Sequence, residues 1–181
     1  VAQTNTNDST IKTYLDNWYK DNILGTENEQ YLKDNTFCND RSFSSSNSGT
    51  GAGTSKTYYR WYDFNSYNST LKCPQQNDAF TVDDTMYGNG ALTYPIGLIT
   101  TDEAVLAGGY STNRNYYLYS GTGYWTSSAN YTNRMRSVDS GGGASNNYGY
   151  MSASSGVRPV LNLSPEVLKN GDGSKENPYM P

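Results

Sequence analysis

The chain contains no histidine and only two cysteines among its 181 residues. Histidine is the usual proton-transfer group near neutral pH, so its absence excludes hydrolytic triads and most zinc and iron sites. A phosphate-binding loop is also missing, because Gly141, Gly142 and Gly143 lack the helix and lysine that would follow one. We therefore expect no enzyme activity, no cofactor and no metal site.

The sequence also lacks long apolar runs and clustered positive charge. No segment approaches the roughly 20 apolar residues needed to cross a bilayer, so we expect no membrane span. The formal charge is −4 and the arginines are scattered, which argues against nucleic acid as a partner. No signal peptide precedes Val1, and we expect that a targeting or anchoring segment has been removed.

Tyrosine is the most conspicuous residue that is present. The chain has 18 Tyr and 3 Trp, although its mean hydropathy is only −0.80. Tyrosine offers rigid contact area and loses little rotamer entropy on binding, which favours a role in recognition. It is also a good strand former, so an all-β surface could use it merely to cover half-buried sheet faces. The length suits a single domain over residues 1–181.

Cys38 and Cys73 are either two buried thiols or a disulfide, and neither lies in a Cys-x-x-Cys spacing. We favour the disulfide. It would stabilise the fold by about 3 to 4 kcal/mol in the chain-entropy model. It would also place the protein in an oxidising compartment, outside the cell or at its surface.

Two helices are expected in the first two thirds of the chain. Apolar residues recur at helical spacing from Ile11 to Ile23, with Asp8 or Ser9 as N-cap and Gly25 just past the end. A second, short helix begins at Thr100 or Thr101, where Glu103 can complete a capping box before Gly108 and Gly109 stop it. The acidic pairs Asp83–Asp84 and Asp102–Glu103 are therefore interpreted as turn and helix caps rather than as catalytic carboxylates.

The remainder is predicted to form loops and short strands. Residues 42–55 are nearly pure Ser, Gly, Asn and Thr and predict a flexible surface loop. Strands are expected at 58–64, 116–119, 123–128, 134–138, 148–152 and 157–163, with an extended segment at 91–99 and a flexible hairpin tip at Gly141–Gly143. The tail turn at Asn170–Gly173 lacks the bidentate acid of a calcium loop. The fold class is therefore α+β, with two helices beside short antiparallel sheets.

Residues 104–165 contain no Lys, Glu or Gln, although all three occur before this segment and Lys and Glu also occur after it. Strand propensity explains part of this bias. Tyr, Asn, Ser, Asp, Gly, Arg, Thr and Ala are all reached by changing the first two bases of an asparagine codon with its pyrimidine third base fixed. Codons for Lys, Glu, Gln, Met and Trp cannot be reached in this way. Between Asn130 and Ser155 the only such residues are Met135 and Met151, which would then be fixed framework positions.

The order of elements resembles the C-type-lectin-like fold. Trp125-Thr-Ser-Ser128 and Gly156-Val-Arg-Pro159 resemble the signatures of its formylglycine-generating-enzyme-like branch, which includes the variable proteins of diversity-generating retroelements. In such proteins adenine-directed mutagenesis varies asparagine codons, and the varied side chains form a ligand site on a constant scaffold. Val157 replaces the usual aromatic residue, and the sugar-binding motifs of calcium-dependent lectins are missing. The cysteines lie too far upstream for the oxidase activity of this branch, which would also need a copper or calcium site.

This resemblance implies a bacterial or phage surface module that binds a protein or glycan ligand through a variable segment at 123–155. The predicted contact residues are Asn130, Tyr131, Asn133, Arg134, Arg136, Ser137, Asp139, Asn146, Asn147, Tyr148 and Tyr150. The core is expected to include Trp125, Val138, Val157, Val160 and Leu161, with Arg158 bonding carbonyl groups beneath the site. The alternative is an undiversified structural or adhesive surface domain, such as a pilin head, in which tyrosines cover a sheet.

Overall fold

The computed structural model describes residues 7–43, 57–59, 69–73, 75–110, 112–131, 134–144, 148–150, 154–174 and 176–179. At residues 42–43, 57–59, 130–131 and 148–150 only the backbone is described. Most of the loop predicted at 42–55 and of the strand predicted at 58–64 therefore lies outside the described residues. Ser42 itself belongs to a strand rather than to that loop.

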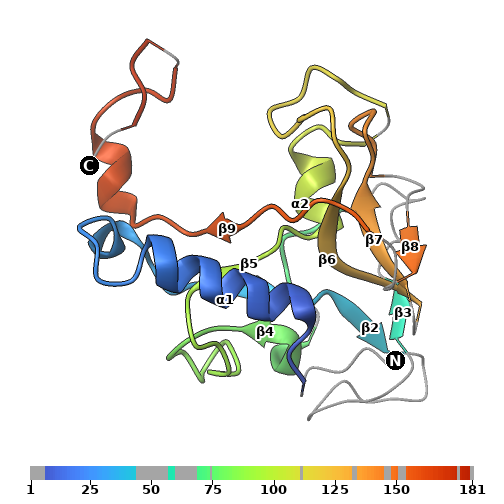
Figure 1. Cartoon of the computed structure of the whole chain (residues 1–181), viewed down its shortest axis with the longest axis horizontal. Helices are drawn as coiled ribbons and strands as arrows, with labels where there is room; N and C mark the ends of the chain where they lie inside the picture. Colours follow the sequence, from blue (N-terminus) through green and yellow to red (C-terminus); the bar gives the residue numbers. More distant parts are fainter. Residues whose placement is uncertain are drawn as a thin grey trace.

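The described residues contain two α-helices and several short antiparallel sheets, which confirms the α+β class (Figure 1). The helices are α1 (Thr10–Asn22) and α2 (Thr101–Leu106), and the 3-10 turns are η1 (Glu29–Tyr31), η3 (Gln76–Asp78) and η4 (Pro165–Lys169). Neither α-helix in this part of the chain is both long and apolar enough to cross a membrane.

The strands pair in four small sheets among the described residues. β1 (Phe37–Cys38) pairs with β4 (Ala79–Phe80), β2 (Arg41–Phe43) with β3 (Thr57–Tyr59), and β5 (Ile96–Gly97) with β9 (Val160–Leu161). The fourth sheet has the order β6 (Tyr124–Tyr131), β7 (Arg134–Val138) and β8 (Tyr148–Tyr150).

Helix α1 begins and ends where the sequence predicts. Of the two candidate N-caps, Ser9 is the one that accepts a hydrogen bond from the backbone N–H of Lys12, at 3.1 Å. Gly25 adopts a φ of +73° just past the end, where a side chain would be strained. Leu15 and Tyr19 are buried, and the Tyr19 ring stacks on Tyr94 with 4.9 Å between ring centroids. This contact fixes α1 beside β5.

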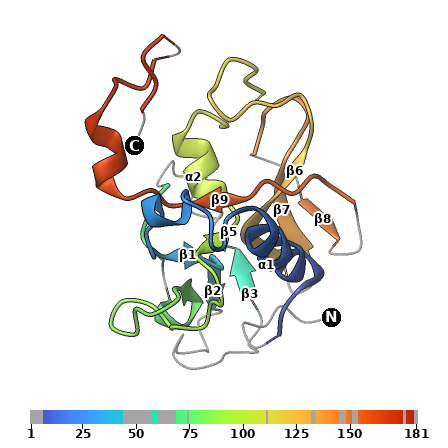
Figure 2. The ribbon, with the colours of Figure 1, turned by 60° about the vertical axis from the view of Figure 1, so that its left-hand side comes forward.

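Helix α2 has the predicted capping box. Thr100 is its N-cap, and its hydroxyl accepts from the N–H of Glu103 at 3.1 Å while the Glu103 carboxylate accepts from the N–H of Thr100 at 2.7 Å. Gly108, with a φ of +111°, ends the helix. Ala104 is buried in a cluster with residues of β6 and β7. A separate cluster holds α1 against β5 and β9, and Figure 2 shows these three elements next to one another.

The strand predicted at 116–119 is wrong. These residues turn back on themselves, because the N–H of Tyr119 bonds the carbonyl of Tyr116 at 3.0 Å. The extended segment at 91–99 contains only the two-residue β5, and the strand predicted at 157–163 shortens to β9. Aromatic residues favour strands, but a strand also needs a neighbour, and none of the described strands pairs with 116–119.

A disulfide joins Cys38 and Cys73, as predicted. Beside Cys38, the side chains of Arg41 and Asp78 form an ion pair in which both are 0% exposed. The Arg41 Nε lies 2.9 and 3.0 Å from the two carboxylate oxygens, and an Nη2 contact completes a bidentate arrangement. Covalent and ionic cross-links therefore hold the β1–β2 and β4 regions together.

Candidate ligand-binding surface

The β6–β7–β8 sheet carries most of the predicted contact residues, and hydrogen bonds to α2 fix its position. The hydroxyl groups of Thr101 and Thr126 lie 3.0 Å apart, and the backbone N–H of Thr101 donates to the Ser128 hydroxyl at 2.8 Å. The N–H of Ser127 bonds the carbonyl of Ile99 at 2.9 Å. Strand β6 is therefore attached to the segment that begins α2.

Asp40 connects this sheet to the N-terminal half of the chain. Ser128 donates its hydroxyl to the Asp40 carboxylate, and both residues are buried. Asp40 has a φ of +43°, in the left-handed region that aspartate tolerates better than most residues. Sequence reasoning missed this contact because it joins residues 88 positions apart, and no local pattern marks either of them.

The strand register places three predicted contact residues in one row. Tyr131 of β6 lies opposite Arg134 of β7, and Arg134 lies opposite Tyr150 of β8. This row is at the end of the sheet where the β6–β7 hairpin turns. Directly opposed residues of antiparallel strands are the closest cross-strand neighbours. The register therefore brings residues from two distant parts of the predicted segment together.

Burial increases along β7 from this row towards the core. Arg134 is half-buried, Arg136 is 4% exposed, and Val138 is buried. The three residues alternate along one strand, so they share one face, which packs towards α2 at its Val138 end. Arg136 therefore does not belong to the exposed contact set, although composition alone placed it there.

Asp139 has a structural role that also differs from the prediction. Its carboxylate accepts hydrogen bonds from the backbone N–H groups of Gly141 at 2.8 Å and Gly143 at 2.9 Å. Gly142 has a φ of +86° and lies so close to Asn113 that an added Cβ would be 2.2 Å from its carbonyl oxygen. The glycine run thus forms a hydrogen-bonded, packed turn rather than a loose hairpin tip.

The structure describes the other predicted residues to different extents. Ser137 is half-buried and lies opposite Trp125 in the register. Asn130 lies in β6 and Tyr148 lies in β8, and for these two residues only the backbone is described. Asn133, Asn146 and Asn147 lie outside the described residues.

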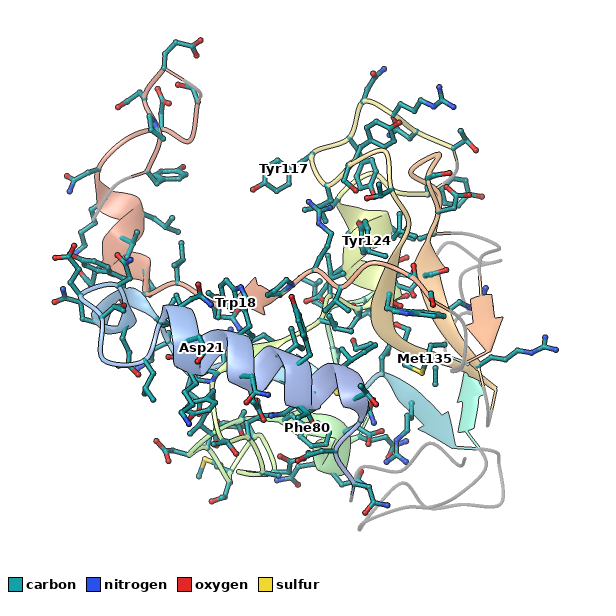
Figure 3. All side chains as sticks on the ribbon, in the orientation of Figure 1. Trp18, Asp21, Phe80, Tyr117, Tyr124 and Met135 are labelled. Atoms are coloured by element: carbon teal, nitrogen blue, oxygen red, sulfur yellow. A yellow bond between two sulfur atoms is a disulfide. The ribbon has the colours of Figure 1, made fainter. Side chains whose placement is uncertain are left out.

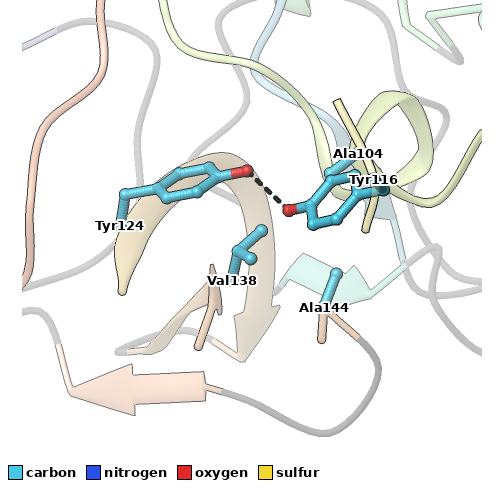
Figure 4. Packing of buried hydrophobic residues seen from close by; sticks show 5 residues of the cluster. All are labelled: Ala104, Tyr116, Tyr124, Val138 and Ala144. Atoms are coloured by element: carbon cyan, nitrogen blue, oxygen red, sulfur yellow. Dashed lines mark hydrogen bonds between the residues drawn. The ribbon is translucent and has the colours of Figure 1, made fainter. Parts of the chain in front are cut away.

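The base of the sheet is a buried tyrosine pair (Figure 4). The hydroxyl groups of Tyr116 and Tyr124 lie 3.1 Å apart, between Ala104, Val138 and Ala144. Burial, followed by the Tyr124 hydrogen bond, raises the pKa of Tyr116 well above its ordinary value of 10.0. The Tyr116 hydroxyl therefore stays protonated in the alkaline range where an exposed tyrosine would ionise, and it can keep the pair hydrogen-bonded there.

Arg158 packs against this tyrosine pair. Its guanidinium carbon lies 4.8 Å from the Tyr124 ring centroid, and its Nη1 donates to the carbonyl of Leu118. The predicted role of Arg158 as a donor to carbonyl groups thus has a specific acceptor. Of the predicted core, Trp125 and Val138 are buried, whereas Val157, Val160 and Leu161 are half-buried.

Tyr117 is an exposed aromatic residue that sequence reasoning did not select. It is 91% exposed and projects from the segment before β6 (Figure 3). It is followed by Leu118, whose carbonyl Arg158 holds, and preceded by the buried Tyr116. Its place in the Lys-, Glu- and Gln-free segment is the signal that could have identified it.

No cluster of three or more Cys, Asp or Glu side chains suited to a metal ion occurs in the described part of the chain. The acidic pairs that sequence reasoning interpreted as caps act as caps through Asp84, which accepts from the N–H groups of Met86 and Tyr87, and through Glu103. Comparison of the chain with models of protein families, with curated proteins and with solved structures found no match.

Proposed function

We propose that this chain is a surface-displayed, ligand-binding module with a C-type-lectin-like fold, and that its variable segment at 123–155 binds a protein or glycan. The ligand surface is the row Tyr131, Arg134 and Tyr150 at the hairpin end of the β6–β7–β8 sheet. The observation that carries the proposal is the register, which gathers these three residues from three adjacent strands.

The chemistry of the row suits recognition. Tyrosine and arginine are enriched among the residues that contribute most to binding energy, because each combines a large contact area with polar groups. The bonds between Thr101, Ser128 and Asp40 hold the sheet in one position. A site on such a preordered scaffold loses less conformational entropy when a ligand binds.

The disulfide supports an extracellular or cell-surface location, because disulfides persist in oxidising compartments. The α+β arrangement of two helices and small antiparallel sheets is compatible with the lectin-like fold. Arg136 and Asp139 are excluded from the proposed contact set, because one is buried and the other caps a turn.

A display library tests the binding role even though the ligand is unidentified. Tyr131, Arg134 and Tyr150 are randomised together, and the library is selected against a panel of unrelated proteins and glycans. A matched control library randomises Thr13, Asn17 and Lys20, which are exposed on α1. We expect specific, folded binders from the sheet library only. Equal yields from both libraries, or loss of folding in the sheet library, would show that the row is not a ligand surface.

The alternative is a structural surface domain, and one observation favours it. The most exposed large apolar side chains include Met86, Tyr87 and Tyr117, which lie on two ordered loops away from the hairpin end of the sheet. Such side chains can serve assembly whether or not the sheet row binds a ligand.

A further inference from the structure

The loop at residues 81–90 presents two adjacent hydrophobic side chains to solvent. Met86 is 74% exposed and Tyr87 is 75% exposed. Single exposed hydrophobic residues are common, but adjacent ones at the tip of a loop form a contact surface that can enter a pocket on a partner.

Hydrogen bonds hold this tip in one conformation. The Asp84 carboxylate accepts from the N–H groups of Met86 at 2.8 Å and Tyr87 at 3.0 Å, and the Gln76 amide donates to the carbonyl of Met86 at 3.0 Å. At the start of the loop, the Asp34 carboxylate accepts from the N–H groups of Val82 and Asp83. The tip is therefore ordered before any partner arrives, which lowers the entropy cost of binding.

The loop is acidic. Asp83 is exposed, Asp34 and Asp84 are half-buried, and residues 81–90 contain no Lys or Arg. The surface therefore combines an apolar tip with carboxylates at its edge, and it suits a partner loop that exposes both aromatic side chains and a cation.

The loop at residues 107–123 has that complementary character. Its only charged residue is Arg114, which is exposed, and it also carries two exposed tyrosines, Tyr117 at 91% and Tyr110 at 38%. It is also ordered at its described residues, since the Asn113 amide donates to the carbonyl of Gly108 at 2.9 Å and Arg158 bonds the carbonyl of Leu118. Residue 111 lies outside the described residues.

The two loops lie at opposite ends of the molecule. In Figures 1 and 2 the 81–90 loop is at the bottom, next to β4, and the 107–123 loop is at the top, beyond α2. Phe80 and Tyr117 mark these two ends in Figure 3. They cannot meet within one chain, but the 81–90 loop of one copy can reach the 107–123 loop of another.

We infer that a second copy of this chain is the partner, and that the acidic Met86–Tyr87 tip of one copy docks against the 107–123 loop of the next, which exposes Arg114 and Tyr117. The contact joins two different surfaces, so it leaves one unoccupied surface of each kind on every dimer and extends into a linear chain rather than a closed dimer. The hairpin end of the β6–β7–β8 sheet takes no part in the contact. The inference is therefore independent of the proposed ligand surface.

Sedimentation velocity of the whole chain tests this inference. Two double variants each remove one surface: Met86→Ser with Tyr87→Ser removes the tip, and Arg114→Ser with Tyr117→Ser removes the aromatic surface. Leu71→Ser is the matched control, because Leu71 is 74% exposed and belongs to neither loop. Circular dichroism and melting temperature establish that all variants fold as the unchanged chain does.

We expect the unchanged chain to form assemblies larger than dimers as its concentration approaches about 1 mM, which is the dissociation constant of a weak contact. Each double variant should raise the dissociation constant by about tenfold or more, while Leu71→Ser leaves it unchanged. An equimolar mixture of the two double variants should form dimers and nothing larger, because each brings the one surface that the other lacks.

Three results would overturn the inference. The first is an unchanged chain that stays monomeric at all concentrations. The second is association that stops at a dimer in the unchanged chain, which indicates a symmetric contact. The third is a mixture of the two variants that fails to form dimers although the unchanged chain associates.

Discussion

Replacing Arg41 by methionine should destabilise the fold more than the loss of any surface charge. Arg41 and Asp78 are both 0% exposed and bind each other through a bidentate contact. Methionine preserves much of the volume of the side chain but removes the guanidinium. The Asp78 carboxylate would then lose the cation that compensates for its removal from water.

The expected cost is about 3 to 5 kcal/mol, the range for removing one partner of a buried ion pair. Total folding free energies are about 5 to 15 kcal/mol, so this single change would remove a large share of the stability. The double variant Arg41→Met with Asp78→Leu should recover much of the loss, because well-packed apolar residues can replace a buried pair at little cost.

The loss of unfolding free energy caused by Arg41→Met should also depend on pH. Burial raises the pKa of Asp78 above its ordinary value of 3.8, and the Arg41 interactions lower it. Without Arg41 the pKa rises further, so the folded variant takes up a proton more readily than the unfolded chain does. Protonation of Asp78 stabilises the folded variant fully below the pKa that Asp78 has in the unfolded chain. This stabilisation is lost as the pH rises through the pKa that Asp78 has in the folded variant. The difference in unfolding free energy between the unchanged chain and Arg41→Met should therefore become smaller when the pH falls from about 7 to about 5.

Urea denaturation of the disulfide-intact proteins, followed by circular dichroism at several pH values, measures these free energies. Asp78→Leu alone provides the fourth member of the double-mutant cycle. A cost below about 1 kcal/mol for Arg41→Met, typical of an exposed pair, would show that Asp78 does not depend on Arg41 for its burial. A deficit that grows as the pH falls would refute the sign of the Asp78 shift.

Three further predictions concern stability. Trp125→Ala should cost about 3 to 5 kcal/mol in urea denaturation, because Trp125 is buried, and a cost below about 1 kcal/mol would place it outside the core. The raised pKa of Tyr116 means that the folded state retains its proton longer, so stability should fall as pH rises above about 10, by up to about 1.4 kcal/mol per pH unit. Tyr116→Phe should reduce that slope in urea titrations at pH 10 to 12, and an unchanged slope would contradict the assignment. Replacing Cys38 and Cys73 together by serine should cost about 3 to 4 kcal/mol, since the bond spans 35 residues, and unchanged denaturation midpoints would count against it.

Local signals were sufficient to predict both helices. In α1 the apolar residues recur at helical spacing, Ser9 caps the start of the helix, and Gly25 follows its end. Each of these signals involves residues only a few positions apart. In α2 the capping box places Thr100 and Glu103 three residues apart. Such short-range hydrogen bonds depend little on the rest of the fold, so the sequence alone reveals them.

The candidate site was harder to predict because it depends on long-range contacts. Composition selected both Arg134 and Arg136, but only the position of β7 against α2 makes one half-buried and the other fully buried. The contact between Asp40 and Ser128 has no local pattern. Tyr117 was assigned to a strand, and its exposure follows from a turn that the aromatic run does not reveal.

Sequencing sibling genes tests the central claim, a variable ligand surface at the hairpin end of the β6–β7–β8 sheet, most directly. Substitutions should be confined to the first two bases of asparagine-type codons and concentrated at Tyr131, Arg134 and Tyr150. The buried Trp125 and Arg136 should stay constant. Variation scattered over all surface loops, or equally frequent at Arg136 and Arg134, would contradict it.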